Sequence, residues 1–125
     1  MKVIVSGSRN ITDYDLMKQA FAESGFFVDC IIHGDATGVD KLGSRYADDN
    51  SLPQVKFPAD WNKYPKAAGP IRNSEMVKFV QDGSEAGLIA LWDGKSRGTF
   101  DCLTKAFRAG LRVYVKCVPA VRTSQ

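Results

Sequence analysis

The sequence predicts an α/β protein: a five-stranded parallel sheet of strand order 3-2-1-4-5, with helices on both faces in a three-layer sandwich. Two observations support this fold class. Short apolar runs typical of buried strands alternate with segments whose apolar residues recur at helical spacing, and three of the runs lead into loops that contain glycine. Parallel sheets of this kind bind ligands beyond the carboxyl ends of the strands, where the direction of winding reverses. Here that point lies between the first and fourth strands.

In the first half of the chain, strands are expected at residues 2–5, 28–32 and 55–57. The first helix follows Thr12 and Asp15, which resemble a capping box, and it carries Leu16, Ala20 and Phe21 before ending at Gly25. A second helix is expected from about residue 39 to residue 49, since a proline at position 53 prevents its continuation.

In the second half, residues 58–70 form a long irregular connection, and a helical pattern runs from about residue 71 to residue 80. The apolar run 88–92 is the fourth strand. The helix after it carries Leu103, Ala106 and Phe107 on one face and ends at Gly110, and residues 112–118 form the last strand. We expect a single domain over residues 1–118 and a loose polar tail over residues 119–125.

Composition narrows the function classes. The net charge of +3 is small and dispersed, so duplex DNA is not expected as a partner. No apolar stretch approaches the length of a membrane span or of a signal-peptide core, which predicts no membrane association and a cytoplasmic location. The cysteines at positions 30, 102 and 117 lack metal-ligand spacing, and we interpret them as buried free thiols. No metal and no cofactor are expected.

The segment from Leu88 to Asp101 is typical of a phosphate-binding turn. A buried strand leads into Asp93, Gly94, Ser96, Gly98 and Thr99, and a helix begins there. Glycine allows the backbone to approach a ligand, and the free N–H groups of a helix start favour an anion. Lys95 and Arg97 add positive charge. For this loop alone, an ordinary strand–helix connection with solvated cations explains the sequence equally well.

The loops after the first two strands are predicted to join this one. Gly7, Ser8 and Arg9 end the first strand, where Arg9 can grip a phosphate or remain a surface cation. Candidates after the second strand are His33, Gly34, Gly38 and Asp40. His33 can serve as a general acid or base or as a structural hydrogen-bonding residue, and Asp40 can contact a ribose hydroxyl or favour the helix start.

Trp61 lies in the long connection, where its ring can stack on a nucleobase, although packing under the loop is the commoner role of such a side chain.

These motifs together resemble a known family. Residues 7–9 (GSR), 33–40 (HGDATGVD), 57–61 (FPADW), 68–76 (AGPIRNSEM) and 92–101 (WDGKSRGTFD) are similar to the YspA-type branch of the SMF/DprA–LOG (SLOG) superfamily. The resemblance implies a Rossmann-like fold and a nucleotide or nucleotide-derived small molecule as ligand. It is also compatible with a homodimer, because relatives often pair through helices.

The resemblance extends to the "lonely guy" enzymes of the superfamily, which release the base from nucleoside 5′-monophosphates. Their Arg-Lys pair corresponds to Arg72 and Asn73, and their PGGxGTxxE stretch corresponds to residues 94–101, with Asp101 in place of the catalytic Glu. Arg72 and Asp101 are therefore the candidate catalytic residues, and Asn73 is a candidate ligand contact. The shorter carboxylate withdraws the charge by about one C–C bond, ~1.5 Å, which puts catalysis in question.

Three functions follow. The first is binding or sensing of a nucleotide-type ligand, and the second is hydrolysis of the N-glycosidic bond with release of a free base. The third and weakest is binding of single-stranded DNA in the manner of DprA, which requires a basic groove with aromatic platforms.

Overall fold

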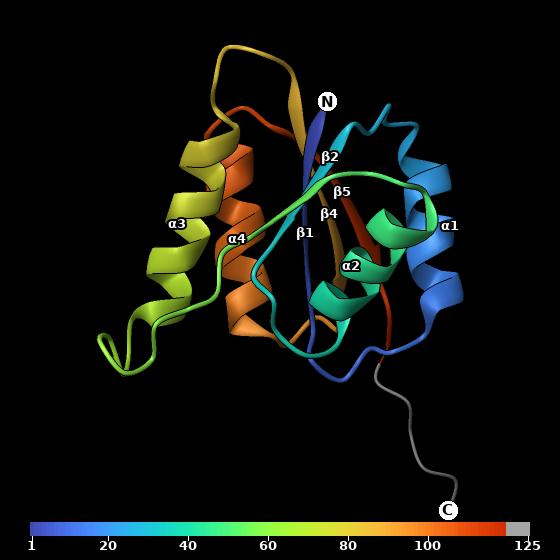
Figure 1. Ribbon diagram of the computed structural model, residues 1–125. Coiled ribbons are helices and arrows are strands. Elements are labelled where there is room, and N and C mark those ends of the chain that lie inside the picture. The colour runs from blue at the N-terminus through green and yellow to red at the C-terminus, as the bar shows by residue number, and fades with distance from the viewer. Residues whose placement is uncertain (120–125) are drawn as a thin grey trace, which may run out of the picture.

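The computed structural model describes residues 1–119 and contains five strands and four helices (Figure 1). The tail predicted for residues 119–125 lies, from residue 120 onward, outside the described residues. The elements are, in chain order, β1 (Lys2–Gly7), α1 (Tyr14–Ser24), β2 (Cys30–His33), α2 (Val39–Asp49), β3 (Gln54–Lys56), α3 (Ala68–Val80), β4 (Ala86–Trp92), α4 (Arg97–Arg108) and β5 (Arg112–Cys117).

The sheet confirms the predicted topology. Its order is β3-β2-β1-β4-β5, and every neighbouring pair is parallel. The longest pairing joins β1 to β4, from Lys2 opposite Ala86 to Gly7 opposite Leu91. Because these two strands are covered on both faces, β4 is continuously apolar and β1 is buried from Val3 to Ser6. The reversal of winding therefore lies between β1 and β4.

Two apolar cores cover the two faces of the sheet. Figure 1 shows α1 and α2 on one face and α3 and α4 on the other. Side chains alternate along β1, so Val3 and Val5 pack with the first pair of helices and Ile4 packs with the second. All three are fully buried. This double coverage fixes the strands and leaves their carboxyl ends free to present loops.

The helix starts differ from the sequence-based expectation. The N-cap of α1 is Asp13, whose Oδ1 accepts the N–H of Asp15 at 3.0 Å, so the predicted capping role of Thr12 is wrong. The left-handed Gly25 (φ 69°) that ends α1 is confirmed. Helix α3 starts at Ala68, three residues earlier than predicted, because Pro70 falls in its first turn, where a missing N–H costs nothing.

Two predictions of burial are also corrected. Phe107 is 73% exposed although it was expected on the buried face of α4, whose buried residues are Thr99, Cys102 and Ala106. All three cysteines are free, but only Cys102 is buried. Cys30 is half-buried and Cys117 is exposed. Burial raises the pKa of the Cys102 thiol to about 12.

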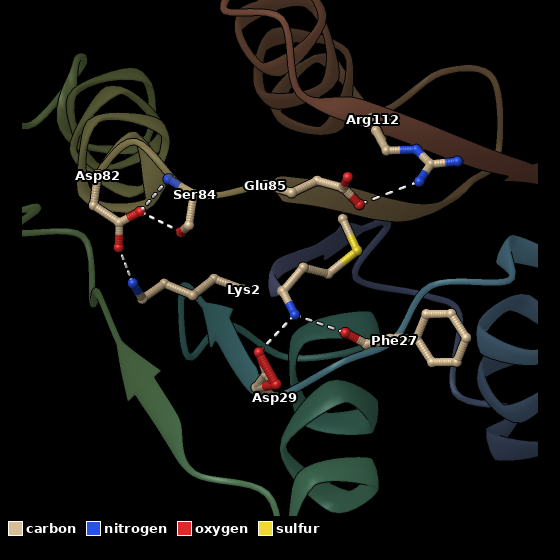
Figure 2. A network of polar contacts seen from close by, with 8 residues as sticks. Lys2, Phe27, Asp29, Asp82, Ser84, Glu85 and Arg112 are labelled. Carbon is tan, nitrogen blue, oxygen red and sulfur yellow. Dashed lines mark hydrogen bonds and ion pairs between the residues drawn. The ribbon is translucent and has the colours of Figure 1, made fainter.

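The amino ends of the strands carry a set of paired charges and hydrogen-bonding groups, which we call the amino-end network: Met1, Lys2, Phe27, Asp29, Asp82, Ser84, Glu85 and Arg112 (Figure 2). Asp82 accepts hydrogen bonds from Lys2 and from Ser84. Arg112 donates to Glu85 at 3.2 Å, and the terminal ammonium of Met1 lies 2.6 Å from a carboxylate oxygen of Asp29. These contacts tie the starts of β1, β2, β4 and β5 together.

Within residues 1–119, none of the helices has the length and apolar character needed to cross a membrane. The cytoplasmic location expected from the sequence stays a prediction.

Candidate functional site

A cavity of about 680 Å³ opens at the carboxyl ends of the strands. We call it the carboxyl-end cavity. The loops after β1, β2 and β4 all contribute to its lining, together with the 57–67 connection and α3, so the predicted convergence of three loops is present in the structure. Its lining residues are Ser6, Gly7, Ser8, Arg9, Asn10, Ala36, Asp40, Trp61, Gly69, Pro70, Arg72, Asn73, Met76, Asp93, Ser96, Arg97, Gly98, Thr99 and Asp101.

The end of β1 is packed tightly against its neighbours. A Cβ atom at Gly7 would lie 2.4 Å from the carbonyl oxygen of Leu91 and 2.6 Å from Val39, so no larger residue fits. The next residue, Ser8, is buried, and its hydroxyl accepts the N–H of Asp93 at 3.1 Å. The β1 and β4 loops are thus held together directly at the point where the winding of the sheet reverses.

The β4 loop is organised by one carboxylate. Asp93 Oδ1 accepts the N–H groups of Lys95 and Ser96, both at 2.8 Å, and these bonds lower the pKa of the Asp93 carboxyl. Ser96 then caps α4 by accepting the N–H of Thr99 at 3.3 Å. The N–H groups of Arg97 and Gly98 precede the first intrahelical bond, and a Cβ at Gly98 would meet open space. This helix start is accessible.

Two guanidinium groups at the cavity have no side-chain partner in the described part of the chain. Arg9 and Arg97 are both exposed and line the cavity, and neither makes an ion pair or a side-chain hydrogen bond with any residue in the range 1–119. The three carboxylates of the lining are all engaged: Asp93 by backbone N–H groups, Asp101 by Lys105 at 3.0 Å, and Asp40 by backbone N–H groups described below. The mouth of the cavity is therefore electropositive.

The β2 loop bends around a buried carboxylate. Asp40 is 6% exposed, and its Oδ2 accepts the N–H of Gly34 at 3.1 Å and that of Ala36 at 3.2 Å. Gly38 has a φ of 75°, and a Cβ there would lie 2.4 Å from the carbonyl oxygen of Arg9, which requires glycine. Burial raises the pKa of the Asp40 carboxyl, and the loop N–H groups, Arg72 and His33 oppose that shift in part.

His33 lies outside the cavity. It is fully buried, its Nδ1 accepts the N–H of Asp35 at 3.0 Å, and its Nε2 lies 2.8 Å from Oε1 of Gln54. Because Nδ1 is the acceptor, Nε2 carries the proton and donates to Gln54. The two ring nitrogens are thereby used by the β2 loop and by β3, and the geometry corresponds to the structural alternative.

Arg72 extends from α3 to the β2 loop. Its Nη1 donates to the carbonyl oxygens of Gly34 at 2.9 Å and Phe57 at 3.4 Å, and its Nε donates to Asn73 Oδ1 at 3.0 Å. A Cβ at Gly34 would lie 1.8 Å from Nη1, so the glycine makes room for the guanidinium. Arg72 lines the cavity, but most of its donors are held by the protein.

Asn73 and Asp101 are in direct contact beside the cavity. The buried Asn73 donates through Nδ2 to Asp101 Oδ2 at 3.0 Å and to the Gly98 carbonyl oxygen at 3.2 Å. Lys105 joins Asp101 to the carbonyl oxygen of Pro70 at 2.8 Å. These contacts couple α3 to the start of α4 beside the cavity.

Trp61 lies at the rim of the cavity. Its ring is 46% exposed, and its edge is the nearest group to a Cβ placed at Gly69, at 3.5 Å. The ring therefore packs on α3 with one part and remains open to solvent with another.

The structure brings most of the predicted site residues together at the cavity and leaves His33, Gly34, Gly38 and Gly94 out of its lining. Gly34 and Gly38 shape the β2 loop from behind. Sequence reasoning missed a group of lining residues: Ser6, Asn10, Ala36, Gly69, Pro70, Met76 and Arg97. Of these, Arg97 carried a signal, since it is a cation in the glycine-flanked turn. The apolar Met76 was marked by its helical spacing and by its place in the 68–76 motif that carries the resemblance.

Comparison with known proteins agrees with this geometry. Residues 1–64 match the model of the YAcAr family, described as the YspA, cpYpsA-related SLOG family. The matched range contains β1, β2, their loops and Trp61. The chain is also similar to the Gene 61 protein of Mycobacterium phage D29, with 31% identity over 122 residues, which covers 90% of this chain and 93% of that protein.

Proposed function

Since the chain belongs to the YspA, cpYpsA-related SLOG family, we propose that it binds a nucleotide or nucleotide-derived ligand in the carboxyl-end cavity. The observation that carries the proposal is the pair of guanidinium groups, Arg9 and Arg97, beside the accessible start of α4, because neither has a partner among residues 1–119. Guanidinium groups and free helix N–H groups are both suited to phosphate. A volume of about 680 Å³ lies within the range of small-molecule sites.

The distribution of charged groups favours the binding of phosphate at the mouth of the cavity. Asp93 turns its carboxylate toward backbone N–H groups, and Asp101 pairs with Lys105. Arg9 and Arg97 are therefore the charged groups at the mouth that remain available to an anion. In this proposal Arg9 and Arg97 contact phosphate, and Trp61 offers one face to the base. Arg72 acts mainly by holding the β2 loop, because Gly34, Phe57 and Asn73 already accept its N–H groups.

Isothermal titration with the four nucleoside 5′-monophosphates, their diphosphates and the corresponding nucleosides tests the proposal. We expect binding of at least one phosphorylated compound and loss of about 100-fold in affinity in the double variant Arg9→Ala/Arg97→Ala, because each charged hydrogen bond is worth about 1.5–3 kcal/mol. The control is Arg108→Ala/Arg112→Ala, which removes the same charge at the other end of the sheet. If no compound binds, or if the nucleosides bind equally well, the proposal is wrong.

A second candidate, cleavage of the N-glycosidic bond, is favoured by one observation: Asp101 lines the cavity and is oriented by Asn73 and Lys105 at 3.0 Å each. A carboxylate so placed can stabilise an oxocarbenium-like centre or orient water. Chromatographic detection of free base from each nucleoside 5′-monophosphate tests it. Release by the wild type and none by Asp101→Asn would support hydrolysis, whereas binding without release of base would restrict the site to binding.

A further inference from the structure

The cavity has a mouth and a floor of different chemistry. The mouth is formed by the exposed residues Arg9, Arg97 and Trp61. The floor is formed by lining residues that are at most 9% exposed, among them Ser6, Asp40, Asn73 and Met76. Positive charge therefore lies at the entrance, and the buried charge of Asp40 lies beneath it.

Asp40 is fixed in place and keeps one oxygen for a ligand. Its Oδ2 accepts the N–H groups of Gly34 and Ala36. Its Oδ1 accepts no hydrogen bond from the residues that the structure describes. Every fully buried side-chain oxygen in that range has a hydrogen-bond partner, so Oδ1 is not fully buried. Oδ1 must therefore be reachable by solvent, and since Asp40 lines the cavity, the cavity is where it is reached. The unused acceptor belongs to a residue that is only 6% exposed.

A buried carboxylate of this kind selects donors and rejects anions. A second negative group on the floor would be repelled in surroundings that screen charge poorly, so phosphate belongs at the mouth. A ligand hydroxyl can donate a hydrogen bond to Oδ1. A ligand that lacks such a donor binds more weakly, because it leaves the buried acceptor without a hydrogen bond.

The three anchor points correspond to the three parts of a nucleotide. Phosphate suits the guanidinium groups and the base suits Trp61, so the sugar that joins them lies over the floor. The donors of that sugar are its hydroxyl groups. Resting on the proposed function, we infer that Asp40 determines specificity for the sugar: its Oδ1 accepts a hydrogen bond from a ribose hydroxyl, so that the site selects ribonucleotides.

Titration calorimetry tests the inference with each nucleoside 5′-monophosphate and its 2′-deoxy and 3′-deoxy counterparts. For the wild type we expect at least one deoxy form to bind about 10-fold more weakly than the ribonucleotide, as loss of a hydrogen bond to a charged group implies. In Asp40→Asn the amide oxygen still accepts the N–H groups of Gly34 and Ala36, while the charged acceptor is lost. The preference for ribose should fall several-fold there and vanish in Asp40→Ala.

The matched control is Asp35→Asn. It removes the same charge from the same loop, but Asp35 pairs with Lys41 at 2.8 Å and does not line the cavity, so the ribose preference should be unchanged. Thermal unfolding of each variant confirms that it is folded.

The outcomes separate the two proposals. Equal affinity for ribose and deoxyribose forms in the wild type, or an unchanged preference in folded Asp40→Asn and Asp40→Ala, overturns the role of Asp40 and leaves nucleotide binding standing. Binding of none of the compounds overturns both.

Discussion

The two ends of the sheet differ in whether their charged groups are paired. In the amino-end network, Lys2 is paired with Asp82, Arg112 with Glu85 and the terminal ammonium with Asp29 (Figure 2). At the carboxyl-end cavity, Arg9 and Arg97 are left without partners within residues 1–119, and Asp40 keeps an open acceptor. Paired surface charges add modest stability. Unpaired charges that converge on a cavity are instead available to a ligand, so the pattern of pairing itself distinguishes the structural end from the functional one.

The largest expected effect concerns the backbone that brings the loops together. Gly7→Ala would place a methyl group 2.4 Å from the Leu91 carbonyl oxygen, and the central strand cannot move away. We expect a loss of about 3 kcal/mol in the free energy of unfolding, measured by urea denaturation. The matched control is Gly98→Ala, which meets open space and should leave stability nearly unchanged. Equal effects of the two substitutions would show that the β1–β4 contact is not tightly packed.

The second prediction compares Arg112, which forms an ion pair with Glu85, with Arg97, which forms no ion pair within residues 1–119. Arg97→Ala should weaken nucleotide binding about 10-fold without lowering the unfolding temperature, because the guanidinium has no partner in the described part of the chain to lose. Arg112→Ala should do the reverse: affinity is unchanged, and stability falls by about 0.5 kcal/mol at most with the loss of the Glu85 pair. Calorimetry and thermal unfolding of both variants measure the contrast, and a fall in unfolding temperature for Arg97→Ala would contradict it.

The smallest expected effect is on stability, because ionisation of Asp82 and ionisation of Asp40 should change the stability of the fold in opposite directions. Hydrogen bonds from Lys2 and Ser84 lower the pKa of Asp82, so its ionised form stabilises the fold above the ordinary carboxyl pKa, and that contribution is lost as the pH falls through the lowered value. Burial raises the pKa of Asp40, so its ionised form destabilises the fold at neutral pH. This penalty begins to shrink as the pH falls through the raised value and is gone below the ordinary carboxyl pKa.

Accordingly, Asp82→Asn should lower the unfolding temperature at pH 7, and Asp40→Asn should raise it slightly. Below the ordinary carboxyl pKa the effect of Asp40→Asn should vanish, because Asp40 is then neutral in both states. The effect of Asp82→Asn should only decrease there and should vanish below the lowered pKa of Asp82. Thermal unfolding as a function of pH provides the measurement. The same sign for both substitutions at pH 7 would refute the contrast between the two ends.

The sequence was a good guide to topology and to the position of the site. Alternating strand and helix patterns are enough to predict the order β3-β2-β1-β4-β5, since right-handed crossovers leave few alternatives. Topology then brings Gly7, Asp40 and Asp93 to one end of the sheet. Residues at strand ends are predictable because the sheet itself dictates where they lie.

Side-chain partners were not predictable in the same way. His33 binds Gln54 and Arg72 binds Gly34, both across long separations in sequence that no local pattern records. The N-cap fell on Asp13 rather than Thr12 because neighbouring residues compete for the same N–H groups. Phe107 fits the helical period yet is 73% exposed, so periodicity alone does not predict which residues near the end of α4 are buried.

The fluorescence of the two tryptophans should report whether the carboxyl-end cavity holds a ligand. Trp61 is partly exposed at the rim of the cavity. Trp92 donates its indole N–H to the carbonyl oxygen of Ser96 at 3.0 Å, next to the start of α4. A molecule that fills the cavity beside Trp61 would shield its indole and perturb the surroundings of Trp92 through the start of α4. Intrinsic fluorescence of the unlabelled chain, compared with that of Trp92→Phe, would therefore follow filling of the site in real time.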